Sequence, residues 1–275
     1  MNAQEKYAEL EKVLKNYGKI AVAFSGGVDS SFLLAAAKKI LGMKKVLAVT
    51  IQSEVTARDE IENSRSFCWN FNIDQKIIKT SVFEIPDFDK NLPDRCYICK
   101  KVVFQKIIDV ARENGFEIVC DGTNASDSND YRPGSKAIAE LKIESPLKLA
   151  GMTKDDIRTL SMQMKLPTWN KPSRACLASR FVYGEKLLVD NLQIVERCEK
   201  FLFDMGFAQA RVRFHGAEDK IKIARIEVLP LDFKRLLDHR DEIVQRFRLE
   251  GFNYVTMDLQ GFRSGSMNEI LNVDN

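Results

Sequence analysis

A loop rich in serine and glycine, SGGVDSS at residues 25–31, carries the clearest chemistry in this sequence. It follows a short apolar run and precedes a segment with helical spacing, so its two glycines would turn backbone amides toward one point. The helix start would add hydroxyl donors and the positive end of the helix dipole, and together these bind phosphate. Asp29 would repel phosphate unless a divalent cation lay between them. The loop residues expected to contact ATP or Mg2+ are Ser25, Gly26, Gly27, Asp29, Ser30 and Ser31.

The same loop excludes two other kinds of nucleotide site. It has no lysine where a Walker A loop carries one, and it lacks the three-glycine pattern of dinucleotide-binding folds. The remaining alternative to ATP binding is a plain glycine-rich turn between a strand and a helix. The combination of strand, glycines, aspartate and helix favours the phosphate site.

Three cysteines lie beside basic residues. Cys96 and Cys99 form a C-x-x-C pair in DRCYICKK, just before a helix expected over residues 100–114, and Cys176 lies in KPSRACLASR. Neighbouring positive charges and a helix N-terminus lower the pKa of a thiol and favour the thiolate. The three thiols therefore predict sulfur chemistry, and they are the candidate catalytic residues. Buried packing explains the other cysteines, Cys68, Cys120 and Cys198.

Four interpretations of the C-x-x-C pair remain open from the residues alone. The pair fits a redox disulfide, half of a zinc site, part of an iron–sulfur cluster, or an incidental spacing. A structural zinc site takes four protein ligands, and a second C-x-x-C pair is absent, although His215 could serve. A cubane cluster normally takes four cysteines, so three would leave one iron open to hold an exchangeable sulfide.

The elements that position these residues form two predicted domains. In the N-terminal part, short apolar runs alternate with segments of helical spacing, which is typical of a doubly wound parallel α/β sheet. Such sheets bind ligands outside the carboxyl ends of their strands, where the glycine loop and the DGTN sequence at residues 121–124 would lie. We predict this domain over residues 1–180 and a smaller α+β domain over residues 181–275.

Composition narrows the class of protein. The formal net charge is +3, which is too small to predict nucleic-acid binding. No apolar run is long enough to span a membrane, and the first residues lack the pattern of a secretion signal. We therefore expect a cytoplasmic protein with reduced cysteines and a small-molecule partner, without a membrane or nucleic-acid partner.

The glycine loop, SGGVDSS, resembles the pyrophosphate loop of the ATP-pyrophosphatase (PP-loop) superfamily. The resemblance implies an adenine nucleotide alpha hydrolase-like fold. It also implies attack of a substrate on the α-phosphate of ATP, with release of pyrophosphate. Gly122 and Thr123 would then lie near the nucleotide, and Asp127 would add a second acidic contact. Asp127 could equally be a turn or cap residue.

Nearly the whole chain resembles the LarE family of ATP-dependent sulfur transferases. The shared sequences are SGGVDSS, RCYICK, DGTN, KPSRACLASR, the strand around Arg211 and Arg213, and the C-terminal GFRSGSMN. The resemblance implies that a carboxylate of a pyridinium biscarboxylate mononucleotide is adenylated with ATP and converted to a thiocarboxylate. This reaction belongs to the biosynthesis of the nickel-pincer nucleotide. The resemblance also implies a homo-oligomer.

The resemblance leaves two sources for the sulfur. In one version of the family, a single cysteine matching Cys176 gives up its sulfur and becomes dehydroalanine. In the other, three cysteines hold a 4Fe–4S cluster that carries sulfide, so that sulfide or another sulfur donor is a further partner. Because the first version has no need of Cys96 and Cys99, their presence favours a cluster held by Cys96, Cys99 and Cys176.

The phosphate of the substrate requires an anion site. Arg211 and Arg213 would share one face of a strand, and guanidinium groups can make paired contacts with phosphate. The resemblance assigns phosphate binding to Arg211 and Arg213, with Arg263 and Ser179 beside them. The alternative is that these arginines are solvated surface charges. Glu227, on a neighbouring strand, could pair with one of them.

Two other functions remain open. A tRNA thiolase also combines a PP-loop with a C-x-x-C pair and a distant cysteine, although the low net charge and the missing RNA-binding appendage disfavour it. The other is a non-catalytic nucleotide-binding module whose cysteines are structural zinc ligands.

Overall fold

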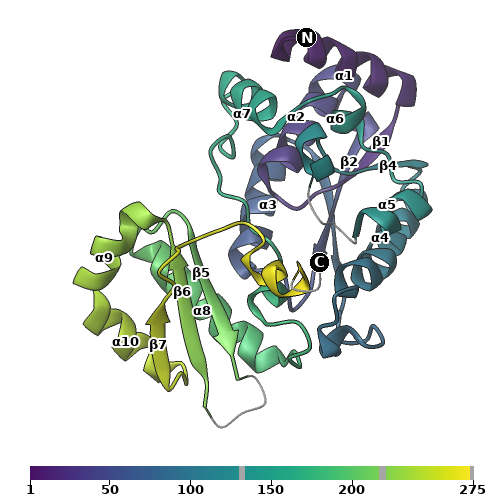
Figure 1. The fold of residues 1–275 in the computed structure, drawn as a ribbon. Helices are drawn as coiled ribbons and strands as arrows, with labels where there is room; N and C mark the ends of the chain where they lie inside the picture. The colour runs from purple at the N-terminus through teal and green to yellow at the C-terminus, as the bar shows by residue number, and fades with distance from the viewer. Residues whose placement is uncertain (130–133, 217–220, 273–275) are drawn as a thin grey trace. The chain divides into compact units, whose positions relative to one another are not determined.

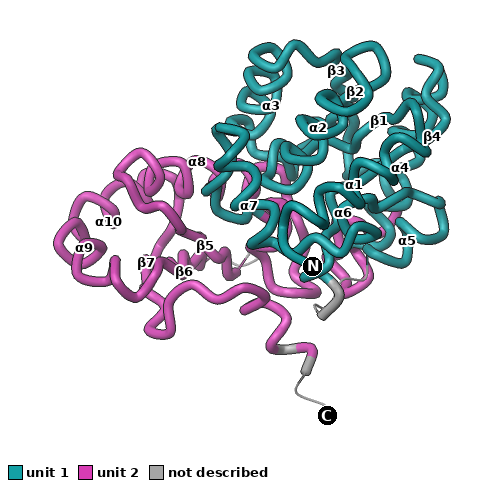
Figure 2. Tube along the Cα trace, turned by 90° about the horizontal axis from the view of Figure 1, so that it is seen from above, with its two compact units in different colours: residues 1–85, 96–174 teal, residues 86–95, 175–275 magenta. Residues whose placement is uncertain are grey.

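The computed structural model of this protein describes the residue ranges 1–129, 134–216 and 221–272 (Figure 1). The chain forms two compact units, and a short segment that interrupts the first unit in sequence belongs to the second. The first unit consists of residues 1–85 and 96–174, and the second of residues 86–95 and 175–275 (Figure 2). The division into domains at residue 180 remains a prediction.

The first unit contains a four-stranded sheet in which every pair of neighbouring strands is parallel. Its strands are β1 (Ile20–Ala23), β2 (Val46–Gln52), β3 (Asp74–Lys79) and β4 (Ile118–Cys120). Their order across the sheet is β3-β2-β1-β4, so the direction of winding reverses between β1 and β4. Ligands of doubly wound sheets bind at such a reversal, outside the carboxyl ends of the strands. The SGGVDS loop follows β1 and the DGTN sequence follows β4, so both leave the sheet at this point.

Helices cover both faces of this sheet (Figure 1). The helices on one face are α1 (Ala3–Tyr17), α2 (Val28–Leu41), α3 (Arg58–Asn70), α6 (Pro146–Leu149) and α7 (Lys154–Gln163). Those on the other face are α4 (Arg95–Glu113) and α5 (Gly134–Glu140). In β1, Val22 belongs to the first core and Ala21 to the second. Because their two faces are buried, β1, β2 and β4 read as apolar runs, whereas β3 at the edge of the sheet is mostly polar, with the sequence DQKIIK. The predicted doubly wound parallel sheet is confirmed.

The helix that carries the C-x-x-C pair begins earlier than predicted. We expected it over residues 100–114, whereas α4 begins at Arg95 and ends at Glu113. Pro93, two residues before the helix, is compatible with a helix start but not with a helix interior. Cys96 and Cys99 therefore lie within the N-terminal end of α4 rather than before it.

The second unit is a smaller α+β structure, as predicted. β5 (Ala210–His215) pairs antiparallel with β6 (Ile223–Val228), and β6 pairs parallel with β7 (Tyr254–Met257). Its longer helices are α8 (Val189–Asp204), α9 (Phe233–Asp238) and α10 (Arg240–Leu249). The ring of Phe214 packs against two other rings of this unit. Its centroid lies 5.2 Å from that of Phe181 and 5.1 Å from that of Phe252. Across the described ranges, every helix is too short or too polar to cross a membrane.

Candidate functional site

The loop between β1 and α2 has the geometry of an anion cradle, a name used below for residues 25–31. Gly26 has a φ of +72°, a left-handed conformation that residues with a Cβ rarely adopt, and Gly27 caps α2. The hydroxyls of Ser25 and Ser30 lie 3.1 Å apart. Ser31 is fully buried in the first turn of α2, and its amide donates to the Gly27 carbonyl at 3.0 Å. The cradle thus presents amides and hydroxyls at the positive end of α2.

The segment after β4 approaches the same helix end. A Cβ on Gly122 would lie 2.9 Å from the backbone nitrogen of Ser30, closer than real Cβ contacts allow. Only glycine therefore lets the DGTN backbone pass this close to the first turn of α2. The PP-loop resemblance implies that Gly122 and Thr123 lie near the nucleotide, and the structure brings Gly122 to the anion cradle.

Asp29 has a cationic neighbour that the sequence analysis missed. Its Oδ2 accepts a hydrogen bond from Lys154 Nζ at 2.5 Å, and its Oδ1 accepts one from Asn124 Nδ2 at 3.4 Å. Lys154 is the first residue of α7 and lies 125 residues away in the chain, so no local spacing indicates it. The side chain of Asp29 is 23% exposed, which leaves its carboxylate accessible to a ligand.

Two carboxylates shape the DGTN turn. Asp121 is buried, and its Oδ1 accepts hydrogen bonds from Ser145 Oγ at 2.7 Å and from the Thr123 amide at 3.2 Å. The Oδ2 of Asp127 accepts the Asn124 amide at 3.0 Å. Bonds of this kind are typical of turn and cap residues. Both carboxylates therefore fix the backbone that lies against α2.

Cys96 and Cys99 lie three residues apart in the first two turns of α4, so their side chains share one face of the helix. Both are partly buried. The turn is anchored to α5, because Glu140 accepts hydrogen bonds from Tyr97 Oη at 2.9 Å and from Lys101 Nζ at 3.1 Å. Within the described ranges, no group of three or more Cys, His, Asp or Glu residues is placed to hold a metal ion. The pair offers two thiols on one helix face.

The thiol of Cys176 differs from those of the packing cysteines. Cys68, Cys120 and Cys198 are buried, as predicted, whereas Cys176 is exposed. Burial raises the pKa of Cys68 to about 12 and raises the pKa values of Cys120 and Cys198 still further. These three thiols stay protonated near neutral pH and are unsuited to sulfur chemistry.

The backbone around Cys176 is held by its own neighbours in the second unit. Cys176 precedes a short 3-10 helix, Leu177–Arg180. Its carbonyl oxygen accepts hydrogen bonds from the amide and the Oγ of Ser179, at 3.0 and 2.8 Å, and from Arg180 Nη1 at 3.0 Å. These bonds fix the carbonyl of Cys176 while its side chain remains exposed.

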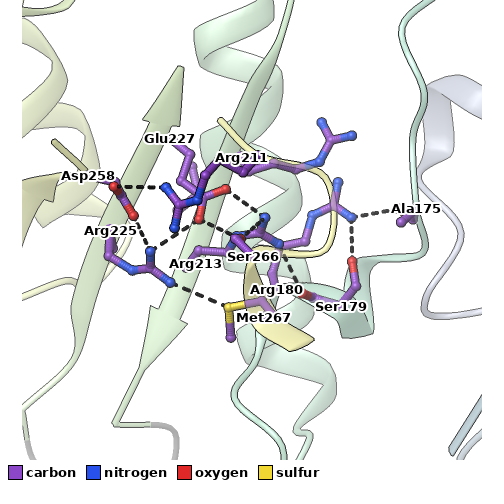
Figure 3. A network of polar contacts seen from close by, with 12 residues as sticks. Ala175, Ser179, Arg180, Arg211, Arg213, Arg225, Glu227, Asp258, Ser266 and Met267 are labelled. Atoms are coloured by element: carbon purple, nitrogen blue, oxygen red, sulfur yellow. Dashed lines mark hydrogen bonds and ion pairs between the residues drawn. The ribbon is translucent and has the colours of Figure 1, made fainter. Parts of the chain in front are cut away.

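Arg180 and Glu199 form a buried ion pair next to this turn. The guanidinium of Arg180 makes two parallel hydrogen bonds to the carboxylate of Glu199, at 2.9 and 2.8 Å. Its Nη1 also donates to the Ala175 carbonyl at 2.6 Å and to Ser179 Oγ at 2.9 Å (Figure 3). Burial alone would raise the pKa of Glu199, but the charge and hydrogen bonds of Arg180 outweigh it and hold that pKa below its usual value.

Replacement of Arg180 by methionine is expected to destabilise the protein by about 3–5 kcal/mol, because Glu199 would remain as a buried charge without its partner. Urea unfolding measures the loss. The matched control is Arg240→Met, since Arg240 lies in an exposed pair with Asp241 at 3.6 Å and should contribute no more than about 1 kcal/mol. Equal losses in the two variants would contradict the structural role of Arg180.

Arg211 and Arg213 share one face of β5, but both are buried rather than solvated. The Nη2 of Arg213 donates to Glu227 Oε2 at 2.6 Å and to Ser266 Oγ at 3.0 Å, and its Nη1 donates to the Ser179 carbonyl at 3.0 Å (Figure 3). The expectation that Glu227 pairs with one of these arginines is confirmed. The pairing ties β5, β6 and the C-terminal segment to the turn that carries Cys176.

Arg211 has a different environment. Its Nη1 donates to the Ala210 carbonyl at 2.7 Å, and its guanidinium lies 5.2 Å from the centre of the Phe262 ring, within cation–π range. The third predicted arginine, Arg263, is partly exposed, and its Nε donates to Glu269 at 3.1 Å. The structure therefore places two of the three predicted arginines in the interior of the unit and one at its surface.

Sequence reasoning gave no role to Arg225, which extends the same network. Its Nη1 donates to Glu227 Oε1 at 3.2 Å and also contacts the carboxylate of Asp258. Its Nη2 lies 3.4 Å from the sulfur of Met267 (Figure 3). The alternation of charged and apolar residues in β6 was the available signal, because Arg225 and Glu227 occupy alternate positions on one face of the strand.

Known proteins resemble this chain at two scales: one family model covers the region of the anion cradle, and several proteins resemble nearly the whole chain. The family model for NAD synthase matches residues 3–93. The chain is 37% identical to the pyridinium-3,5-bisthiocarboxylic acid mononucleotide synthase of Lactiplantibacillus plantarum, across 97% of this chain and 95% of that protein. It is 35% identical to an uncharacterized protein of Synechocystis sp., across 98% and 97% of the two chains. A protein of Methanocaldococcus jannaschii, also uncharacterized, is 29% identical across 93% and 94%. The similarities to these three proteins span both units, whereas the NAD synthase model covers the part of the chain that contains the anion cradle.

Proposed function

Because this chain belongs to the LarE family of pyridinium-3,5-bisthiocarboxylic acid mononucleotide synthases, we propose that it is an ATP-dependent sulfur transferase of nickel-pincer nucleotide biosynthesis. In this proposal it adenylates a carboxylate of a pyridinium biscarboxylate mononucleotide and converts it to a thiocarboxylate. The observation that carries the proposal is the approach of the DGTN segment to the anion cradle at the N-terminus of α2. Such a helix end stabilises phosphate.

The first unit supplies adenylation. A carboxylate oxygen of the substrate attacks the α-phosphorus of ATP, the bond from that phosphorus to the bridging oxygen breaks, and pyrophosphate leaves. Negative charge then develops on the leaving group, and the amides and hydroxyls of the cradle are arranged to stabilise it. Gly122 and Thr123 would line the nucleotide from the other side. Sulfur then attacks the acyl carbon of the adenylate, and AMP leaves.

We also propose that Mg2+ accompanies ATP at Asp29. Carboxylate and phosphate oxygens are the ligands that Mg2+ prefers, and the partly exposed carboxylate of Asp29 fits this requirement. Lys154 and Asn124 orient its two oxygens. Asp127 is the second candidate ligand, although its Oδ2 already accepts the Asn124 amide. When bound, Mg2+ neutralises charge on the phosphates.

For sulfur delivery we propose a 4Fe–4S cluster held by Cys96, Cys99 and Cys176. Two of these thiols share a helix face and the third is exposed, so the donor set suits an iron–sulfur cluster. When bound by these three residues, such a cluster would supply sulfide from a separate donor at the iron that has no protein ligand. The alternative is that Cys176 itself gives up its sulfur, in which case Cys96 and Cys99 take no part.

In the second unit we propose that Arg211, Arg213, Arg263 and Ser179 form the anion site for the substrate phosphate. Arg211 and Arg213 lie on one face of β5, and the Arg213 guanidinium reaches the backbone of Ser179. Glu227 and Ser266 hold Arg213 in place, which orients its planar guanidinium for contact with phosphate oxygens.

Replacement of Arg211 by glutamine is expected to raise the KM for the mononucleotide by about 10- to 100-fold, which corresponds to one lost charge-assisted hydrogen bond. The KM for ATP should stay unchanged, because ATP binds in the first unit. Steady-state pyrophosphate release, with each substrate varied in turn, measures both constants. Arg248→Gln, at an exposed position of α10, is the matched control. Parallel changes in both KM values would contradict the assignment.

The proposed function is tested on anaerobically purified wild-type protein. With ATP and the mononucleotide, we expect pyrophosphate release that depends on the mononucleotide and a thiocarboxylate product detected by mass spectrometry. Iron and acid-labile sulfide should be present before turnover. Zinc in their place, with no substrate-dependent pyrophosphate release, would overturn the proposal in favour of a nucleotide-binding module. Thiolation of tRNA by the same preparation would overturn it in favour of a tRNA thiolase.

A further inference from the structure

The anion cradle has no lysine of its own, yet a lysine from a distant part of the chain reaches it. Lys171 Nζ donates a hydrogen bond to the Gly26 carbonyl at 3.0 Å, across 145 residues of sequence. Phosphate loops that bind ATP commonly include a lysine that contacts the terminal phosphates. We propose that Lys171 supplies this cation and binds the β- and γ-phosphates that leave as pyrophosphate. The proposal rests on the ATP chemistry proposed above.

The backbone holds Lys171 in place. Its amide donates to the Thr168 carbonyl at 3.0 Å, and its own carbonyl accepts a hydrogen bond from Arg158 Nη2 at 3.4 Å. Pro172 follows directly and restricts the chain further. The Lys171 side chain is only 16% exposed. A lysine already ordered in this way loses little conformational entropy when it binds an anion.

The carboxylate nearest to Lys171 is too distant to neutralise its charge fully, so the ammonium can still attract an anionic ligand. The Oε1 of Glu60 lies 3.9 Å from its Nζ, at the outer limit of an ion pair. By contrast, Lys154 contacts Asp29 at 2.5 Å, and Arg174 is bound to the carboxylate of Asp59. A polyphosphate at the cradle would therefore compete with a carbonyl and a distant carboxylate for the Lys171 ammonium. To bind Lys154, the polyphosphate would have to displace the short ion pair between Lys154 and Asp29.

Burial strengthens the interaction between the Lys171 ammonium and a bound anion. Desolvation lowers the pKa of Lys171, Arg174 adds repulsion, and Glu60 compensates only in part. A bound polyphosphate would supply the missing negative charge beside a partly desolvated ammonium, where charges interact more strongly than in water.

Calorimetric titration with inorganic pyrophosphate, ATP and AMP tests the proposal, with Mg2+ present throughout. In Lys171→Met, the Kd values for pyrophosphate and ATP should rise about 10- to 100-fold, as expected for a lost charge-assisted contact. The Kd for AMP should not change, because AMP lacks the β- and γ-phosphates. Lys171→Arg should restore part of the affinity. Lys148→Met, at an exposed position of α6, should leave all three Kd values unchanged.

The outcomes separate this inference from the proposed function. An equal loss of affinity for ATP and AMP in Lys171→Met, or no loss for ATP, would overturn the role of Lys171 while the ATP chemistry stands. Wild-type protein that binds neither ATP nor pyrophosphate would overturn the proposed function itself. If Lys171→Met does not fold, Lys171→Gln replaces it. The affinity for pyrophosphate must then follow the order lysine, arginine, glutamine, and any other order rejects the inference.

Discussion

Replacing Cys176 with alanine is expected to abolish thiocarboxylate formation while substrate-dependent pyrophosphate release continues. In the proposed function, the anion cradle of the first unit would activate the carboxylate, whereas Cys176 would serve sulfur delivery under either sulfur source. Removal of a residue that acts directly in chemistry commonly costs far more than a binding contact, so we expect sulfur transfer to fall by about 1,000-fold or more. Pyrophosphate and thiocarboxylate measured in the same reaction separate the two steps.

Cys68→Ala is the matched control for Cys176→Ala. The Cys68 thiol is buried and burial raises its pKa to about 12, so its loss should leave sulfur transfer near the wild-type rate. The mass of the wild-type chain after turnover then identifies the sulfur source. A chain that has lost the elements of hydrogen sulfide at Cys176 would reject the cluster in favour of the sacrificial cysteine. Loss of pyrophosphate release in Cys176→Ala would show that the two steps are not divided as proposed.

Replacing Asp29 with asparagine is expected to slow substrate-dependent pyrophosphate release by about 100- to 1,000-fold, a loss typical for a group that stabilises charge in the transition state. Asparagine keeps the shape of the side chain but removes the charge that a divalent cation requires. It also leaves Lys154 without the carboxylate that it contacts at 2.5 Å. Initial rates across a Mg2+ titration measure the effect, and the variant should need more Mg2+ for half-maximal rate.

Asp155→Asn provides the comparison for Asp29→Asn. Asp155 is exposed in the first turn of α7, directly after Lys154, so it changes the charge near the same lysine without touching the cradle. Its variant should keep the wild-type rate and the wild-type Mg2+ dependence. A similar loss in both variants would mean that general charge around Lys154, rather than the Asp29 carboxylate, controls the reaction.

Local patterns predicted the scaffold of the site well. Apolar runs predicted β1, β2 and β4 of the parallel sheet, and the pair of glycines predicted the turn in which Gly26 adopts a positive φ. The helix α4 begins at Arg95, five residues before the predicted start, because nothing in the side chains of Cys96 and Cys99 prevents a helix. Lys154 and Lys171 were missed because their partners lie 125 and 145 residues away.

The sequence by itself determined where the backbone turns and which residues carry reactive groups. Those properties depend on steric limits within a few residues and on apolar periodicity, both of which can be read locally. Only the tertiary structure decided which charges meet. The sequence left open which arginine Glu227 would pair with, and the structure buries Arg213 against it. The structure also pairs Arg180 with Glu199, although each could have been a solvated charge. Ion pairing and burial depend on distances that packing sets, and no spacing along the chain contains them.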